Sequence, residues 1–266
     1  MAEKPEIASP IQEFAVDSLQ VRVFEDRRSL GMAAAAYVDS VIAARQQVAQ
    51  MAHVIFAAAP SQNEFLESLV SRQSFDTMRL VCLHMDEYLG LPVEHPSSFR
   101  NYLLRHYFRP AGIPSRHLRL ISGESTELPL KVCLEYENQL RETPPDVVCA
   151  GIGENGHLAF NDPPVADLLD PVWVKTVRLD PACRAQQVHD GCFARLEDVP
   201  THAYTLTIPA LLSAKVVSVV VPGIRKAEAV RDTLRTAISE ACPATALRRH
   251  EGAILWLDRD SASLVI

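Results

Sequence analysis

Short apolar segments rich in β-branched residues alternate along the chain with longer segments of helical periodicity. The strand-like segments are 19–24, 53–59, 80–84, 118–121, 146–150, 172–178, 203–208, 215–221 and 253–257. Apolar residues lie three and four positions apart in the segments 28–47, 63–72, 98–108, 128–141 and 226–236. This alternation, with strands as continuously apolar as VVSVVV, predicts an α/β fold: a doubly wound, mainly parallel sheet with helices on both faces.

The chain has 266 residues, which suits one large domain with a substantial core. Residues 1–18 are polar and contain prolines, so they are predicted to form a loose N-terminal arm before a single domain at 19–266. Residues 163–200 have weak periodicity and are predicted to be a long active-site loop region around one strand.

Composition excludes several classes of protein. A net charge of −7 without a basic tract argues against binding to nucleic acid or an anionic membrane. The N-terminus lacks a signal sequence and no apolar run reaches about 18 residues, so the chain is expected to be cytoplasmic. The six cysteines form no C-x-x-C pair, so we expect neither disulfides nor a zinc cluster, and no metal.

Two carboxylates, Asp86 and Glu87, directly follow the predicted strand 80–84. In a parallel sheet this places them at the carboxyl edge, where ligands bind, and a partly desolvated carboxylate there can act as a general base. Further on, Ser97 or Ser98 is a candidate N-cap of the next helix. The alternative is that both acids only cap a turn and pair with a neighbouring arginine.

A second polar cluster follows the strand 146–150. Gly151 and Gly153 begin a tight turn in which the backbone can approach a ligand closely. The spacing G-x-G-x-x-G is formally that of a dinucleotide fingerprint, but prolines soon interrupt the helix that should follow, so no nucleotide cofactor is expected. His157 lies between Asn155 and Asp162, which can fix its tautomer for proton transfer near neutral pH.

These motifs together resemble a known family. In order, the chain carries MDEYLGLP, HPSSF, GIGENGHLAFNDP, VPTHAYTLTIPALLSA and VPGIRKAEAV. Over about residues 53–257 they are similar to the glucosamine-6-phosphate deaminase (isomerase) family. The resemblance implies a Rossmann-like fold shared with 6-phosphogluconolactonases, and a metal-independent enzyme of the hydrolase class. It would convert an amino-sugar phosphate to a ketose phosphate and ammonia.

The resemblance also implies catalytic roles. Asp86 would abstract the C2 proton of the sugar, and His157 would open the ring, helped by Asn155 and Asp162. Asp162 is one methylene shorter than the glutamate usual in the family. Glu87 and the glycine turn at 151–153 are expected to contact the substrate. If these roles hold, Asp86 and His157 must face each other across one sugar-sized cavity.

The phosphate end departs from the family pattern. Where relatives have a glycine- and threonine-rich turn, this chain has Ala57-Ala-Ala-Pro-Ser-Gln-Asn-Glu64. Ser61 and Glu64 are predicted to form a capping box, which would occupy the amides that a phosphate needs. The alternative is that the side chains of Ser61, Gln62 and Asn63 contact the sugar or its phosphate.

Two cations match positions that bind phosphate in the family: Lys226, in GIRK, and Arg184.

Three hypotheses about function follow from the motifs: an amino-sugar-phosphate deaminase or isomerase, a 6-phosphogluconolactonase in which His157 activates water, and a non-catalytic sugar-phosphate sensor with an altered phosphate turn. Retention of both Asp86 and His157 favours the first. The expected partner is a small sugar phosphate, and assembly into a homo-oligomer is left open.

Overall fold

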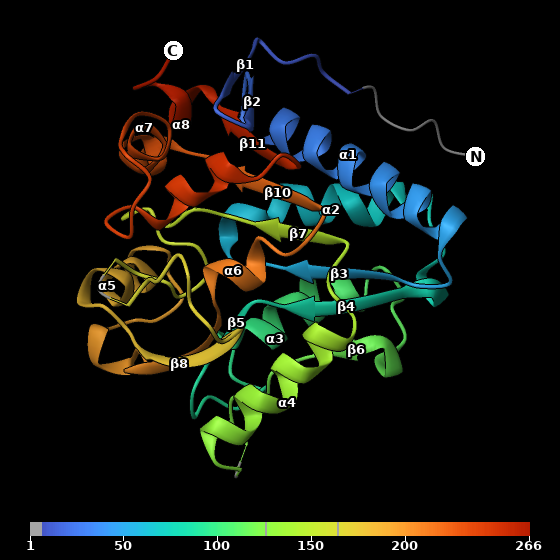
Figure 1. Cartoon of the computed structure of the whole chain (residues 1–266), viewed down its shortest axis with the longest axis vertical. Helices are drawn as coiled ribbons and strands as arrows, with labels where there is room; N and C mark the ends of the chain where they lie inside the picture. Colours follow the sequence, from blue (N-terminus) through green and yellow to red (C-terminus); the bar gives the residue numbers. More distant parts are fainter. Residues whose placement is uncertain (1–6, 126, 164) are drawn as a thin grey trace.

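The computed structural model describes residues 7–125, 127–163 and 165–266. An eight-stranded sheet forms its centre (Figure 1), and all neighbouring strands are parallel except β1 and β2. In spatial order the strands are β1 (Gln12–Val16), β2 (Leu19–Phe24), β11 (Ala253–Asp258), β10 (Val216–Val221), β7 (Val147–Ala150), β3 (Ala52–Phe56), β4 (Leu80–His84) and β6 (Leu118–Arg119). The predicted α/β fold with a mainly parallel sheet is confirmed.

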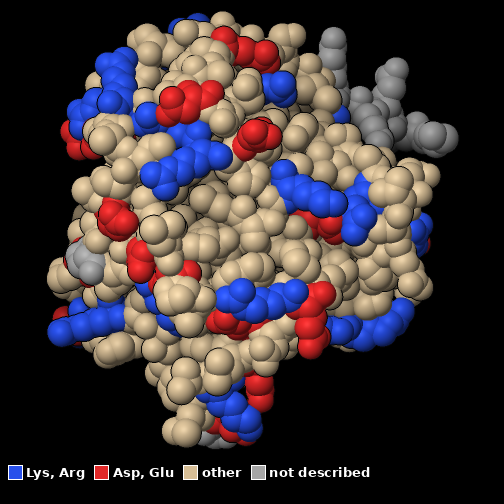
Figure 2. Space-filling view, viewed as in Figure 1, with Lys and Arg blue, Asp and Glu red and all other residues tan. Residues whose placement is uncertain are grey.

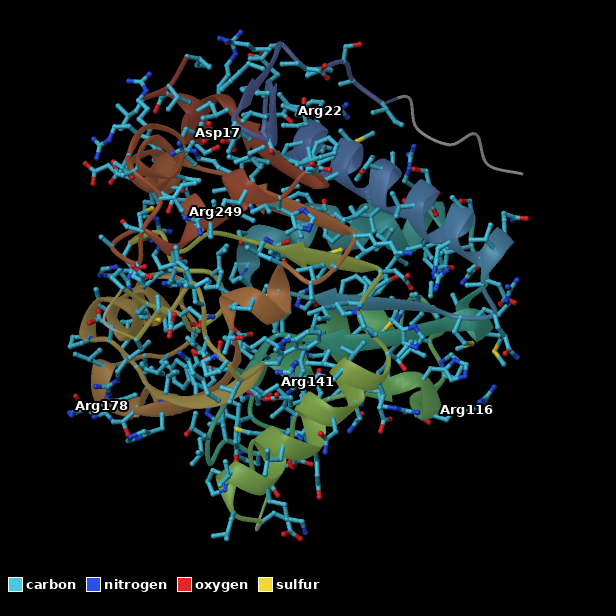
Figure 3. All side chains as sticks on the ribbon, in the orientation of Figure 1. Asp17, Arg22, Arg116, Arg141, Arg178 and Arg249 are labelled. Atoms are coloured by element: carbon cyan, nitrogen blue, oxygen red, sulfur yellow. The ribbon has the colours of Figure 1, made fainter. Side chains whose placement is uncertain are left out.

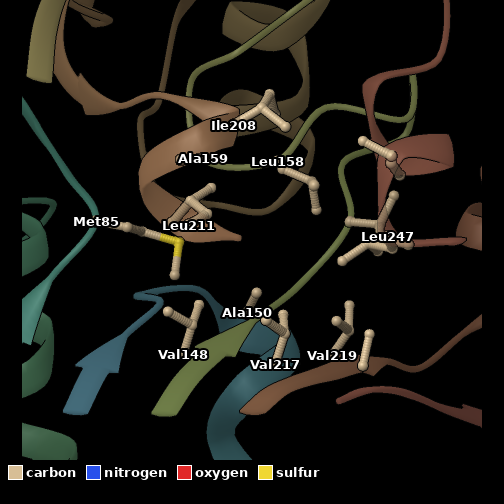
Figure 4. Close-up of a cluster of buried hydrophobic side chains, with 14 of the residues drawn as sticks. Met85, Val148, Ala150, Leu158, Ala159, Ile208, Leu211, Val217, Val219 and Leu247 are labelled. Atoms are coloured by element: carbon tan, nitrogen blue, oxygen red, sulfur yellow. The ribbon is translucent and has the colours of Figure 1, made fainter. Parts of the chain in front are cut away.

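Helices cover both faces of this sheet, because its central strands are apolar on both sides. The helices are α1 (Arg27–Val48), α2 (Asn63–Arg72), α3 (Phe99–Leu103), α4 (Pro129–Glu142), α5 (Pro181–His189), α6 (Ile208–Leu211), α7 (Ala227–Arg235) and α8 (Arg259–Ala262). One core cluster contains α1 and α2, and the other contains α4, α6 and α7. Figure 4 shows part of the second cluster, where Val148, Val217 and Val219 of the sheet face Leu211 and Leu247.

A second, antiparallel sheet lies outside the main one. It has the order β5 (Asp86–Tyr88), β9 (His202–Leu206) and β8 (Val174–Arg178). The Glu137 carboxylate of α4 accepts hydrogen bonds from the amides of Trp173 (2.8 Å) and Val174 (3.3 Å). The Arg141 guanidinium lies 4.6 Å from the centre of the Trp173 ring (Figure 3). These contacts fix the small sheet against α4, and β5 carries the first predicted site residue.

The structure differs from the sequence-based prediction in two places. Within the predicted arm, residues 1–6 lie outside the described residues, but residues 12–16 form β1, which pairs with β2. Within the predicted loop region, of which residue 164 is not described, Asp180 caps a helix, α5. Its periodicity is weak because two of its buried residues are the glutamines Gln186 and Gln187 rather than apolar side chains.

Charges are mixed on the surface. On the face shown in Figure 2, lysines and arginines are interspersed with aspartates and glutamates, and they do not form one continuous basic region. Among the described residues, no helix combines the length and the apolar composition that a membrane crossing requires.

Candidate active site

A cavity of about 370 Å³ opens where the central strands β3, β4, β7 and β10 end. This is the edge at which parallel α/β sheets bind ligands, and the volume lies within the range of small-molecule sites. Most of the wall comes from the segments that follow these strands, together with α5: residues 57–62, 85–86, 151–154, 186–187 and 222–226. Asp86 and His157 both line it, so the two predicted catalytic side chains share one cavity.

Asp86 lies in a largely apolar part of the wall. Met85, Phe99 and Phe160 line the cavity with it, and only 7% of the residue is exposed. Burial, and then the negative charge of Glu87, raise the pKa of the Asp86 carboxyl well above its usual range. A carboxylate that water stabilises poorly binds a proton more strongly, which is the property a general base needs.

His157 is held from behind by two side chains that do not line the cavity. Its Nδ1 lies 2.9 Å from the Asp162 carboxylate and 2.7 Å from Asn155 Oδ1. Asn155 Nδ2 donates to the same Asp162 oxygen at 2.9 Å. The shorter acid therefore reaches the imidazole. A proton on Nδ1 satisfies these acceptors, which leaves Nε2 unprotonated and able to exchange protons.

Asp162 is fully buried, yet it remains ionised near neutral pH. Burial alone would raise its pKa, but the hydrogen bond and charge of His157, with the hydrogen bond from Asn155, lower the pKa below its ordinary value. Nearby, burial and the Asp162 charge raise the pKa of the Cys183 thiol. A negative carboxylate behind an imidazole stabilises the imidazolium that forms when the ring accepts a proton.

The glycine turn is needed for close packing. A Cβ built on Gly153 would lie 2.1 to 2.4 Å from ring atoms of His157, so any side chain there would displace the imidazole. At Gly151 a Cβ would lie 3.0 Å from the Gln62 amide nitrogen, a tighter contact than usual. Both glycines line the cavity, as predicted, but their residue type is set by the packing of neighbouring side chains.

Basic side chains also line the cavity. They are Lys226, Arg27 and Arg225, and Ser61 lines it too, as do the acidic residues Glu154, Asp190 and Asp260. Burial lowers the pKa of the Lys226 ammonium, although the charges of Asp190 and Glu154 oppose this shift. No ion pair within 4 Å is found for Lys226 among the described residues, whereas Arg27 is paired with Glu64. A cation without a paired carboxylate in a cavity wall is suited to an anionic group of a ligand.

Comparison with known proteins decides the family. A model of the family described as glucosamine-6-phosphate isomerases/6-phosphogluconolactonase matches residues 25–256. A glucosamine-6-phosphate deaminase of Bacillus thuringiensis (strain Al Hakam) is 35% identical over 193 residues, which cover 73% of this chain and 71% of that protein. One of Bacillus cereus (strain AH820) is equally similar.

The chain belongs to the glucosamine-6-phosphate isomerase/6-phosphogluconolactonase family. The resemblance seen in the motifs is thus confirmed. Among solved structures, a monomeric glucosamine-6-phosphate deaminase matches with a TM-score of 0.84 and 26% identity, over 92% of this chain and 99% of that one. A 6-phosphogluconolactonase of Thermotoga maritima, 20% identical, shares the fold with a TM-score of 0.73 over 90% of this chain and 99% of that one.

In this member of the family, the predicted capping box is not formed. A 3₁₀ turn at Pro60–Gln62 delays the start of α2, so Gln62 rather than Ser61 is the N-cap and makes no side-chain capping bond. The Glu64 carboxylate pairs with Arg27 instead (2.6 Å). The prediction that Glu64 occupies the amides of this turn was therefore wrong, and the charge of Glu64 is neutralised.

Gln62 lines the cavity, but its side-chain amide is used mainly for hydrogen bonds within the protein, which connect the turn before α2 to β10. It is 1% exposed, and its Nε2 donates to Ser61 Oγ and to the carbonyl of Val220, both at 3.2 Å. This arrangement orients Ser61 at the cavity wall. Of the three side chains proposed to contact the ligand here, Asn63 does not line the cavity and Ser61 is the best placed.

The structure does not support the predicted contact of Glu87 with the substrate. It is fully buried and does not line the cavity. Its carboxylate accepts hydrogen bonds from the Ser98 hydroxyl (2.8 Å), from the Arg100 backbone amide (3.0 Å) and from Arg100 Nε (3.3 Å). Glu87 therefore stabilises the start of α3, which matches the capping alternative for this one of the two acids. Of the two predicted N-cap candidates, Ser97 and Ser98, it is Ser98 that caps the helix.

Arg184 also lies outside the cavity lining, so its role as a substrate-binding residue stays a prediction that this cavity does not support. Its Nη2 donates to the carbonyls of Leu196 and Val199, at 2.6 and 2.8 Å, and so supports the loop before β9. Further along α5, Gln186 and Gln187 line the cavity instead. Sequence reasoning missed them, as it missed Arg27; a Gln-Gln pair on a polar helix is too common to indicate a site.

Proposed function

We propose that this chain converts glucosamine 6-phosphate and water to fructose 6-phosphate and ammonia. The observation that carries the proposal is one cavity with a buried carboxyl, Asp86, an oriented imidazole, His157, and an unpaired ammonium, Lys226. The relatives that are 35% identical over most of their length are glucosamine-6-phosphate deaminases. The reaction consumes one water and releases the amine, so it is hydrolytic in its atom balance.

Ring opening is assigned to His157. In the closed sugar, the bond between C1 and the ring oxygen breaks when a proton reaches that oxygen and another leaves the C1 hydroxyl. The Nε2 side of the imidazole can exchange these protons, because Asp162 and Asn155 hold the Nδ1 side. The result is an open-chain aldehyde with an amine on C2.

Isomerisation is assigned to Asp86. Its carboxylate removes the C2 proton and returns a proton to C1. The C1 oxygen gains a proton and the C2 amine loses one, so C1 becomes an alcohol and C2 an imine. Water then adds to C2 and ammonia departs, which gives the ketose. The buried position of Asp86 suits this step, since desolvation raises its proton affinity toward that of a carbon acid.

The phosphate is assigned to Lys226 and Ser61 in the cavity wall. Lys226 supplies the charge and Ser61 a hydroxyl, and Arg27 lines the same cavity. The altered turn favours side-chain recognition in place of a glycine-rich backbone cradle. A non-catalytic sugar-phosphate sensor would need the phosphate-binding residues. It would need neither a buried base such as Asp86 nor a histidine oriented by a carboxylate, as His157 is.

The test is an assay of purified protein with glucosamine 6-phosphate, following ammonia and fructose 6-phosphate together. Unphosphorylated glucosamine and 6-phosphogluconolactone are the controls. Equal amounts of the two products, with little turnover of either control, are expected. Hydrolysis of the lactone without ammonia release would support the lactonase hypothesis and refute the deaminase. The cytoplasmic location and any self-association remain predictions from the sequence.

A further inference from the structure

A group of potential metal ligands lies directly behind the cavity. Ligand atoms of His157, Asp162 and Cys183 all lie within 4.8 Å of one another, and all three residues are buried. They come from two segments, the turn after β7 and the helix α5. Among the described residues, no other set of three histidine, cysteine, aspartate or glutamate side chains brings its ligand atoms this close together. Spacing in the sequence could not indicate it, because Cys183 is 21 residues from Asp162.

The hydrogen bonds of the group are incomplete. Asp162 Oδ1 is contacted by His157 and Asn155, but Asp162 Oδ2 is buried and makes no hydrogen bond of normal geometry among the described residues; the Cys183 thiol is the polar group that interacts with this carboxylate from α5. A fully buried carboxylate oxygen without a partner is unusual in folded proteins. It is an open acceptor beside a thiol and an imidazole nitrogen, a donor set that zinc and related soft cations prefer.

We propose that His157, Asp162 and Cys183 form an inhibitory site for a thiophilic divalent cation such as Zn²⁺. Three protein ligands leave the fourth tetrahedral position for water. On binding, the thiol proton leaves to solvent and the imidazole proton moves from Nδ1 to Nε2. The freed Nδ1 lone pair of His157 then binds the cation in place of its hydrogen bonds to Asn155 and Asp162, and Nε2, now protonated, can no longer accept a proton. The inhibitory part of this inference rests on the proposed function, because it requires His157 to act in ring opening. The binding part does not.

The cavity is the route by which a cation would reach the group. His157 lines the cavity, whereas Asp162 and Cys183 lie behind it with 0% and 1% of their surface exposed. A bound sugar phosphate would therefore cover the entrance. We expect substrate or product to protect the enzyme from Zn²⁺, and a chelator to restore activity.

Binding is tested with Co²⁺ alone, without any assay of activity. A cobalt–thiolate bond gives a charge-transfer absorption band in the near ultraviolet, which Zn²⁺ should remove by displacement. The wild-type protein and Cys192→Ala should both show the band, and Cys183→Ala and Cys183→Ser should not. Cys192 is the matched control because it lines the same cavity but is outside the ligand group. Circular dichroism checks that each variant is folded.

Inhibition is tested with Zn²⁺ and glucosamine 6-phosphate. The Cys183 variants should need more than about tenfold higher Zn²⁺ for half-inhibition than the wild type and Cys192→Ala. A cobalt–thiolate band that persists in both Cys183 variants, or no band in the wild type, would overturn the proposal. A Cys183-dependent band in a protein without deaminase activity would leave the metal site standing and refute the proposed function.

Discussion

The imidazole of His157 lies against the backbone of Gly153, with a built Cβ at 153 only 2.1 to 2.4 Å from Cε1, Nε2 and Nδ1. The Nδ1 atom also contacts Asp162 and Asn155. The orientation of the ring therefore depends both on the glycine and on these two polar side chains.

Gly153→Ala is expected to reduce kcat strongly without abolishing the fold. The added methyl group must displace the imidazole, and a misplacement of about 1 Å can cost roughly 100-fold in rate. The measurement is kcat together with a thermal melt. Gly112→Ala is the control, because its Cβ would meet nothing within 4 Å and the residue lies outside the cavity, so it tests backbone strain alone. Wild-type kcat in Gly153→Ala would show that the close packing is not needed for catalysis.

Asp86→Asn is expected to abolish deamination while stabilising the protein. The folded state raises the pKa of this carboxyl above the value of about 3.8 expected for the unfolded chain, so its ionisation near neutral pH destabilises the fold. The amide removes that cost, and Tm at pH 7 should rise by about 2–4 °C, the change that roughly 1 kcal/mol produces. The advantage should disappear below about pH 3.8, where the carboxyl is protonated in both states.

Binding of glucosamine 6-phosphate to Asp86→Asn should stay within about tenfold of the wild type, because the base acts mainly in the transition state. Isothermal titration calorimetry measures this directly. Unchanged turnover in the variant would remove Asp86 from the mechanism.

Asp162→Asn should have the opposite effect on stability. The pKa of this carboxyl is lowered in the folded state, so the carboxylate stabilises the fold above about pH 3.8, and this contribution is lost as the pH falls through the lowered pKa. The variant should therefore have a lower Tm than the wild type at pH 7, with the difference shrinking in acid. Its kcat should fall by about 100-fold or more, since the imidazole loses its charged support. Equal melting temperatures at pH 7 would contradict the assignment.

Lys226→Gln should weaken substrate binding more than it slows the chemistry. Loss of a charge-assisted contact to phosphate predicts a KM for glucosamine 6-phosphate that is roughly 10- to 100-fold higher. Any residual activity on unphosphorylated glucosamine should change little. Lys215→Gln is the matched control, since Lys215 is exposed and lies outside the cavity lining. If both variants have wild-type KM, the phosphate must bind elsewhere.

Glu87→Gln should destabilise the protein and leave KM unchanged. The substitution removes the charge that pairs with Arg100 inside the protein, and breaking a buried pair typically costs about 3–5 kcal/mol. Urea unfolding measures the loss, with the exposed Glu94→Gln as control. A raised KM with normal stability would instead restore Glu87 as a substrate contact.

The sequence by itself determined the secondary structure of the core and the location of the site. Apolar periodicity predicted the central strands and the long helices, because burial on one or both faces sets the residue pattern. Asp86 and His157 were found because they follow strands of a parallel sheet, whose carboxyl ends meet at one edge. The motifs of the family pointed to the same two residues.

Only the tertiary structure decided which neighbouring polar residues share the site. Asp86 and Glu87 are adjacent, but side chains alternate along β5, so one enters the cavity and the other reaches the start of α3. Similarly, the way α5 packs places Gln187 in the cavity wall, whereas Arg184 donates hydrogen bonds to backbone carbonyls. The contact of Cys183 with His157 joins segments distant in the chain, and no local pattern encodes it. Such contacts are fixed by how the elements pack together, a property of the folded chain as a whole.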